Sequence, residues 1–135
     1  MFRRIATVAG AAIVSGAVFA LTTPSALAAP ANVQTFTIPG VHGISAWGSY
    51  LRTGSTVRVT VCVKDTARDV YGGAAAGVAY DDGEHRQAVT AITIGYGHTG
   101  CQTMISRYTA HLGVDALSGW RNGKVRQAGP ARQVY

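Results

Sequence analysis

The sequence predicts a small all-β domain, an antiparallel β-sandwich with immunoglobulin-like architecture and seven to eight short strands. Three observations support this prediction. In Thr56–Lys64 valines occupy every odd position and Arg, Thr, Cys and Lys occupy the even ones, which is the period-two pattern of a half-buried strand. No stretch is dominated by the Glu, Lys and Leu residues that favour helices. Turn sequences recur at spacings typical of a β-sandwich.

Two strands are expected before this segment. Val33–Ile38 is the weaker of the two and ends at Pro39-Gly40. Ile44–Leu51 is followed by Arg52-Thr53-Gly54-Ser55, whose glycine and serine favour a chain reversal. A hairpin between Ile44–Leu51 and Thr56–Lys64 follows from this order.

Loops and strands are expected to alternate after Thr56–Lys64. Aspartate next to glycine and asparagine next to glycine are the strongest short hairpin signals. The expected segments are the loop Asp65–Gly73, a strand of small residues over Ala74–Tyr80, a hairpin at Asp81-Asp82-Gly83-Glu84, a strand over Gln87–Ile94, the glycine loop Gly95–Gly100 and a second hairpin at Asn122-Gly123.

The segment Cys101–Val114 fits two patterns. As a helix it would place Ile105, Tyr108 and Leu112 on one side, with Gly113 as a C-cap. As a strand it would place on one face Met104, Tyr108, Ala110, Leu112 and Val114. We favour the strand because threonine is enriched in strands and the surrounding sequence is all-β.

The N-terminal segment 1–28 has the three parts of a secretory signal peptide. Met1–Arg4 is basic, Ile5–Leu21 is apolar and uncharged, and Ala26-Leu27-Ala28 is a small-residue cleavage site. We expect cleavage after about Ala28 and no stable membrane anchor afterwards. The pair Arg3-Arg4 leaves a twin-arginine route open, although the general export route fits better.

The predicted mature chain, residues 29–135, has the length of one domain. The basic head, the Ala- and Gly-rich run and the absence of organelle signals are typical of a bacterial secreted protein. A rival interpretation is an uncleaved anchor. Its apolar run would have only 17 residues, near the lower limit for crossing a bilayer, and contains two glycines.

Export places the chain where disulfides form, so Cys62 and Cys101 are expected to pair. A disulfide that closes the loop between Cys62 and Cys101 stabilises the fold by roughly 4 kcal/mol in the chain-entropy model. Cys62 shares its strand face with polar residues and not with the valines. The bridge should therefore join neighbouring strands of one sheet outside the valine core, unlike the bridge between sheets in antibody domains.

Charge gives only weak information about partners. Without Arg3 and Arg4, ten Lys and Arg face six Asp and Glu, a net charge of +4. After Asp115 all charged residues are basic: Arg121, Lys124, Arg126 and Arg132. This tail suits an anionic polymer, but a solvated face is the commoner reason for such a pattern. No aromatic platform accompanies it, so no specific nucleic acid partner is expected.

Two motifs imitate cofactor or metal sites. Gly95–Gly100 matches G-x-G-x-x-G, but a chain of this length without βαβ units cannot build the dinucleotide-binding fold. We therefore interpret it as a glycine turn and expect no cofactor. No metal is expected either, because the histidines lack ligand spacing and the acidic cluster fits a hairpin tip. These residues are His42, His85, His98 and His111, and Asp81, Asp82 and Glu84.

An enzyme is not expected. The chain has no G-x-S-x-G elbow, and an oxidised Cys62 cannot act as a thiol nucleophile. In an up-and-down arrangement Asp65 and Asp69 lie at one end, whereas the acidic hairpin lies at the other. The two groups therefore cannot share an acid–base site. Trp47 and Trp120 are expected in the core, with a carbohydrate-stacking face as the lesser alternative.

One candidate surface remains. The loops Asp65–Gly73 and Gly95–Gly100 should lie at the same end, directly beyond the disulfide. Tyrosines among glycines on anchored loops are typical of recognition surfaces, although ordinary loop composition gives the same pattern. The candidate binding residues are Asp65, Arg68, Asp69, Tyr71, Tyr96 and His98.

The sequence thus favours a secreted, non-enzymatic module that binds an extracellular protein or a cell-wall polymer. An enzyme inhibitor that uses Asp65–Gly73, or a small hydrolase, is the first alternative. A structural protein of the cell surface is the second.

Overall fold

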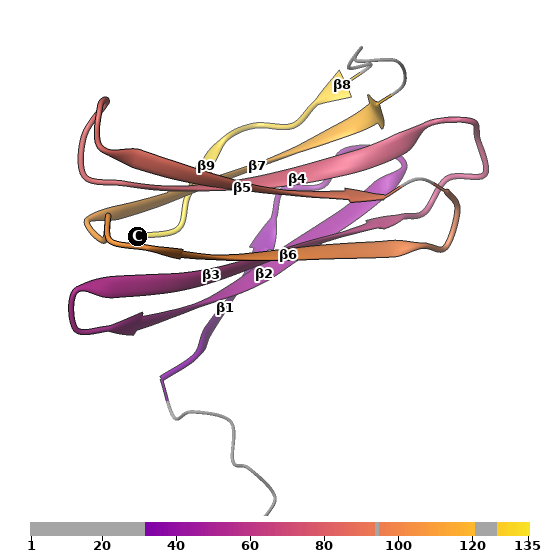
Figure 1. The fold of residues 1–135 in the computed structure, drawn as a ribbon. Helices are drawn as coiled ribbons and strands as arrows, with labels where there is room; N and C mark the ends of the chain where they lie inside the picture. The colour runs from indigo at the N-terminus through magenta and orange to yellow at the C-terminus, as the bar shows by residue number, and fades with distance from the viewer. Residues whose placement is uncertain (1–31, 94, 121–126) are drawn as a thin grey trace, which may run out of the picture.

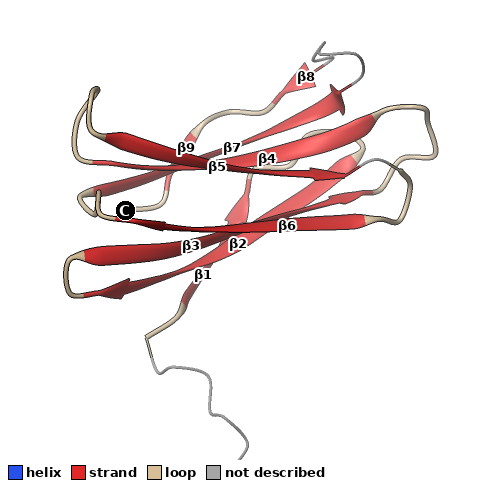
Figure 2. Cartoon of the chain, in the orientation of Figure 1, coloured by secondary structure: helices blue, strands red, loops and turns tan. Residues whose placement is uncertain are grey.

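A computed structural model describes residues 32–93, 95–120 and 127–135, and its described residues form strands and no helix (Figure 2). The strands are β1 (Gln34–Ile38), β2 (Ile44–Thr53), β3 (Thr56–Asp65), β4 (Gly72–Tyr80), β5 (Arg86–Thr93), β6 (Thr99–Ser106), β7 (His111–Trp120), β8 (Gln127–Ala128) and β9 (Arg132–Gln133). The predicted signal peptide, the hairpin at Asn122-Gly123 and the basic residues Arg121, Lys124 and Arg126 lie outside the described residues.

The strands form two antiparallel sheets that pack as two layers (Figure 1). One sheet has the order β1-β2-β3-β6, and the other has the order β5-β4-β7-β8, with β9 also paired to β7. The chain crosses between the sheets after β3, after β5 and after β6. The predicted β-sandwich is confirmed.

The core forms where the valines of β3 meet small residues of the opposite sheet. Val57, Val59, Val61 and Val63 are all fully buried, as their period-two spacing predicts. In β4, a Cβ added at Gly77 would lie 3.0 Å from Val61 Cγ2. The run of glycine and alanine in β4 therefore lets the two sheets approach closely.

The segment Cys101–Val114 is extended, so the strand interpretation is confirmed over the helix. It is not one strand, however, because it divides into β6 and β7, which belong to different sheets. At the break, the Asp81 carboxylate accepts hydrogen bonds from the backbone N–H groups of Thr109 and Ala110, at 2.9 and 3.0 Å. The chain turns at this point, where the carboxylate of Asp81, 28 residues before Thr109, accepts its backbone N–H groups.

The disulfide joins Cys62 of β3 to Cys101 of β6. The two residues are direct partners in the register of one sheet, with their Cα atoms 4.1 Å apart. Cys62 alternates with the buried valines and so lies on the opposite face of β3. The predicted bridge within one sheet is confirmed.

The expectation that Trp47 belongs to the core is wrong. Trp47 is 36% exposed and lies opposite Cys62 on the outer face of the sheet. The inward positions of β2 beside it are Ala46 and Gly48, where the ring of Phe36 leaves no room for a side chain at Gly48. The surroundings of the Trp120 side chain lie outside what the structure describes.

The segment after β8 packs along the sandwich. The Val134 N–H donates to the Leu112 carbonyl at 2.7 Å. The ring of Tyr135 lies 4.7 Å from that of Tyr50, with the Arg52 guanidinium 4.6 Å from its centroid. Burial raises the pKa of Tyr135. This segment therefore links β7 of one sheet to β2 of the other.

Candidate functional site

The two loops of the predicted surface meet at one end of the sandwich, the right-hand end in Figure 1. The Asp65 N–H donates to the His98 carbonyl at 3.1 Å, and the Gly97 N–H donates to the Asp65 carbonyl at 2.9 Å. The Thr93 hydroxyl also donates to the His98 carbonyl, at 2.9 Å. The end of β3 and the β5–β6 loop are thus tied together by their backbones.

The glycines of the G-x-G-x-x-G motif have structural roles in this turn. Gly97 has a φ of +77°, a conformation that favours glycine. A Cβ at Gly100 would overlap the carbonyl of Ile92. Gly100 belongs to strand β6, so the helix that a dinucleotide site requires does not begin there. The motif is explained by the turn and by close packing.

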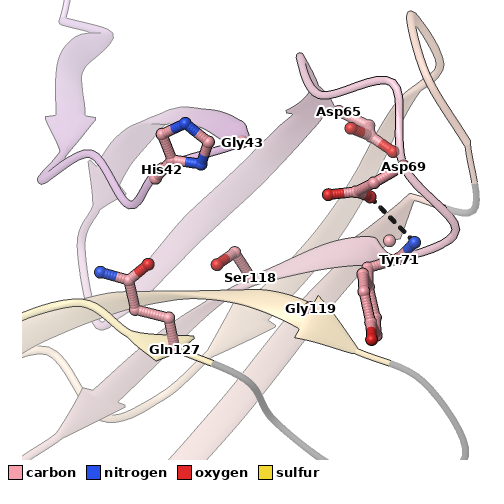
Figure 3. Close-up of a pocket in the computed structure, with 9 residues that line it drawn as sticks. His42, Gly43, Asp65, Asp69, Tyr71, Ser118, Gly119 and Gln127 are labelled. Atoms are coloured by element: carbon pink, nitrogen blue, oxygen red, sulfur yellow. Dashed lines mark hydrogen bonds between the residues drawn. The ribbon is translucent and has the colours of Figure 1, made fainter.

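A pocket of about 170 Å³ opens at this end, where the two sheets meet (Figure 3). Its residues come from the approach to β2, the end of β3, the β3–β4 loop, the start of β4, the end of β7 and the start of β8. They are His42, Gly43, Asp65, Asp69, Tyr71, Gly72, Ser118, Gly119 and Gln127. Side chains far apart in the sequence therefore surround one space.

Asp65 is the most unusual residue of the pocket. The residue is only 1% exposed, because it continues the inward face of the β3 valines. Its Oδ1 accepts the Ala67 N–H at 3.0 Å, whereas its buried Oδ2 receives no hydrogen bond from the described residues. Buried carboxylate oxygens are costly unless they are paired. Asp65 Oδ2 is thus a buried acceptor without a partner among the described residues, in a side chain that lines the pocket.

Asp69 brings a second carboxylate to the same side of the pocket. Its Oδ1 accepts the N–H of Tyr71 at 2.9 Å, which folds the β3–β4 loop into a tight turn. Figure 3 shows Asp65, Asp69 and Tyr71 on one side of the space, with His42 and Gln127 on the other. The arrangement presents oxygen acceptors to a ligand.

The six predicted site residues divide into two groups. Asp65, Asp69 and Tyr71 line the pocket. Arg68 and Tyr96 lie outside that lining and pair with each other, the guanidinium 4.9 Å from the ring centroid. His98 has an exposed side chain and contributes its backbone carbonyl to the loop junction.

Besides three glycines, sequence reasoning missed three lining residues with polar side chains: His42, Ser118 and Gln127. A lone histidine, a strand serine and a glutamine carry no distinctive motif. Asp65 itself left a signal, since it continues the odd-numbered valine series and so had to point inward. The sequence predicts that a loop begins at Asp65, whereas the structure places Asp65 in β3.

At the opposite end, the Asp82 carboxylate of the acidic hairpin is engaged by groups of the hairpin itself. Asp82 Oδ1 accepts the N–H groups of Glu84 and His85, both at 2.8 Å, and its Oδ2 lies 2.8 Å from His85 Nδ1. The backbone N–H of His85 is the main reason that the pKa of Asp82 falls to about 2. Among the described residues, no group of three or more His, Cys, Asp and Glu could hold a metal ion.

Comparison with protein-family models, curated proteins and solved structures found no match. In the part of the chain that the structure describes, no helix has the length and apolar character needed to span a membrane. The pocket and the loops around it are therefore the features of the molecule that bear on function.

Proposed function

We propose that this chain is a small bacterial secreted protein that binds an extracellular protein or a cell-wall polymer. One observation carries the proposal: a buried Asp65 carboxylate lies in a pocket between the sheets, and one of its oxygens has no hydrogen-bond partner among the described residues. The signal-peptide pattern of residues 1–28 supports export, and the disulfide is compatible with an oxidising compartment.

The disulfide also supports binding, because it holds both loops at their base. Cys62 lies three residues before Asp65, and Cys101 lies three residues after His98. Loops on a rigid scaffold lose little conformational entropy when they bind a partner. The exposed pair Arg68–Tyr96 lies beside this junction and extends the surface beyond the pocket. A macromolecule can therefore contact the loops while one of its groups enters the pocket.

The binding test uses residues 29–135, which contain every described strand. Immobilised protein is incubated with culture supernatant and cell-wall fractions, and retained material is quantified. A double variant Tyr71→Ala/Tyr96→Ala is expected to retain at least about tenfold less, since buried aromatic contacts dominate recognition. Tyr108→Ala, at the opposite end, is the matched control and should retain as much as the wild type. Equal retention by all three proteins would reject the loop surface.

Export makes a separate prediction. Cells that express the full chain should release a protein that begins at Ala29, because the A-x-A site ends at Ala28. N-terminal sequencing and the intact mass of the released protein measure this directly. A membrane-bound product that keeps residues 1–28 would contradict cleavage.

A further inference from the structure

We infer that the pocket binds a primary ammonium group on a flexible chain, such as the end of a lysine side chain, with Asp65 Oδ2 as its main acceptor. This inference rests on the proposed function, because it identifies the part of the partner that enters the pocket. The charge of the described lining, the number of carboxylate oxygens without a partner and the size of the pocket favour this ligand.

The charged residues of the described pocket lining are acidic, although the chain is basic overall. Its described lining includes the carboxylates of Asp65 and Asp69 and no lysine or arginine. An unpaired carboxylate away from bulk water attracts a cation more strongly than an exposed carboxylate does, because the local dielectric is lower. A cation that can donate hydrogen bonds therefore complements the site.

The number of free oxygens separates the possible cations. Asp65 Oδ1 and Asp69 Oδ1 each already accept a backbone N–H. A guanidinium is best matched by two parallel bonds to one carboxylate, and among the described residues only one oxygen of Asp65 lacks a hydrogen-bond partner. An ammonium is a compact charge that can donate to oxygens in several directions. Calcium takes six to eight oxygen ligands, whereas the pocket brings two carboxylates together.

The size of the pocket fits the end of one side chain. Its volume is about 170 Å³, and a cavity of about 150 Å³ accommodates benzene. The site thus accepts an ammonium with a few methylenes. The rest of the partner must remain outside, against the loops.

Small probes test this inference without the natural partner. ¹⁵N-labelled residues 29–135 are titrated with Nα-acetyl-lysine amide and with Nα-acetyl-norleucine amide, which has similar length and no charge. The lysine probe is expected to shift the amides of Asp65, Ala67, Tyr71 and Ser118 in a saturable manner. The norleucine probe should bind at least about tenfold more weakly, because it lacks the charge-assisted hydrogen bond.

Asp65→Asn is the decisive variant, since it can keep the Oδ1 acceptor for Ala67 and removes the charge. It should fold, with the amide dispersion of the wild type, and lose the response to the lysine probe. Asp82→Asn removes an exposed carboxylate at the opposite end and should respond like the wild type. The lysine probe should also raise the Tm of the wild type and leave that of Asp65→Asn unchanged.

Three results would overturn the inference: equal binding of the norleucine probe, an unchanged lysine response in Asp65→Asn, or tighter saturable binding of Nα-acetyl-arginine amide or CaCl₂. The retention assay separates this failure from failure of the proposed function. If the probes do not bind but Asp65→Asn still reduces retention of a macromolecule, the proposed binding at the loop end is kept and the ammonium ligand is rejected. If the probes do not bind and the wild type retains no macromolecule either, both proposals are rejected.

Discussion

At the scale of single residues, three aspartates show how position decides what a carboxylate does. Asp81 accepts backbone N–H groups from the β6–β7 turn and so fixes the end of β6. Asp82 accepts hydrogen bonds from backbone N–H groups of its own hairpin. Asp65 is buried, and its Oδ2 has no partner among the described residues. Only the last of these combines the cost of burial with an acceptor left for a ligand.

Asp82 should make stability depend on pH in acid. Its pKa is lowered to about 2 in the folded state, from an ordinary value of 3.8. The stabilisation by the ionised form is therefore complete above about pH 4 and is lost as the pH falls through about 2. Asp82→Asn keeps an acceptor but not the charge. Its Tm should lie slightly below that of the wild type at pH 6, and most of the difference should be lost by pH 2. A constant difference across this range would contradict the assignment.

At the scale of elements, β3 connects core, cross-link and site. Its odd-numbered residues supply the buried valines and end with Asp65, and Cys62 on its other face forms the disulfide. β6 begins after the β5–β6 loop and continues to the other cysteine. The same two strands therefore support the core and hold the two candidate loops side by side.

Removing the cross-link should weaken this support. The cysteines are 39 positions apart, so Cys62→Ala/Cys101→Ala is expected to lower the free energy of unfolding by about 4 kcal/mol in the chain-entropy model. Urea denaturation followed by tryptophan fluorescence measures the change. The single variant Ile105→Ala is a suitable comparison, because Ile105 lies on β6 and is 57% exposed. The idea fails if the double variant unfolds at the same urea concentration as the wild type.

At the scale of the whole molecule, the segment after β8 joins the two sheets. Val134 and Tyr135 pack against the core cluster, and the Arg132 guanidinium donates to the Thr37 carbonyl of β1 at 3.0 Å. β9 pairs with β7 of the other sheet. This segment therefore contributes to the sandwich as a whole and not to one strand pair.

Tyr135 is the place to test that contribution. Tyr135→Ala removes an aromatic contact with Tyr50 and a cation–π contact with Arg52, and should destabilise the fold by about 2 kcal/mol. Tyr135→Phe keeps the ring. It should be as stable as the wild type or more stable, because the buried hydroxyl has no hydrogen-bond partner among the described residues. Thermal unfolding of the three proteins measures both effects, and a Phe variant as unstable as the Ala variant would refute this account.

The sequence by itself determined the features that depend on alternation along one strand. The valine series of β3 predicted its buried face, the position of Cys62 predicted a bridge within one sheet, and the turn sequences predicted which loops share an end. Each follows from the two-residue period of a strand, which places side chains on one face or the other.

Tertiary structure determined which residues pack against those strand faces. It divided Cys101–Val114 between two sheets, through contacts with Asp81, and left Trp47 on the outer face. It also brought His42, Ser118 and Gln127 to the pocket that Asp65 lines. Local periodicity reports the direction of a side chain, whereas its neighbours across the sandwich depend on pairings between segments distant in the chain.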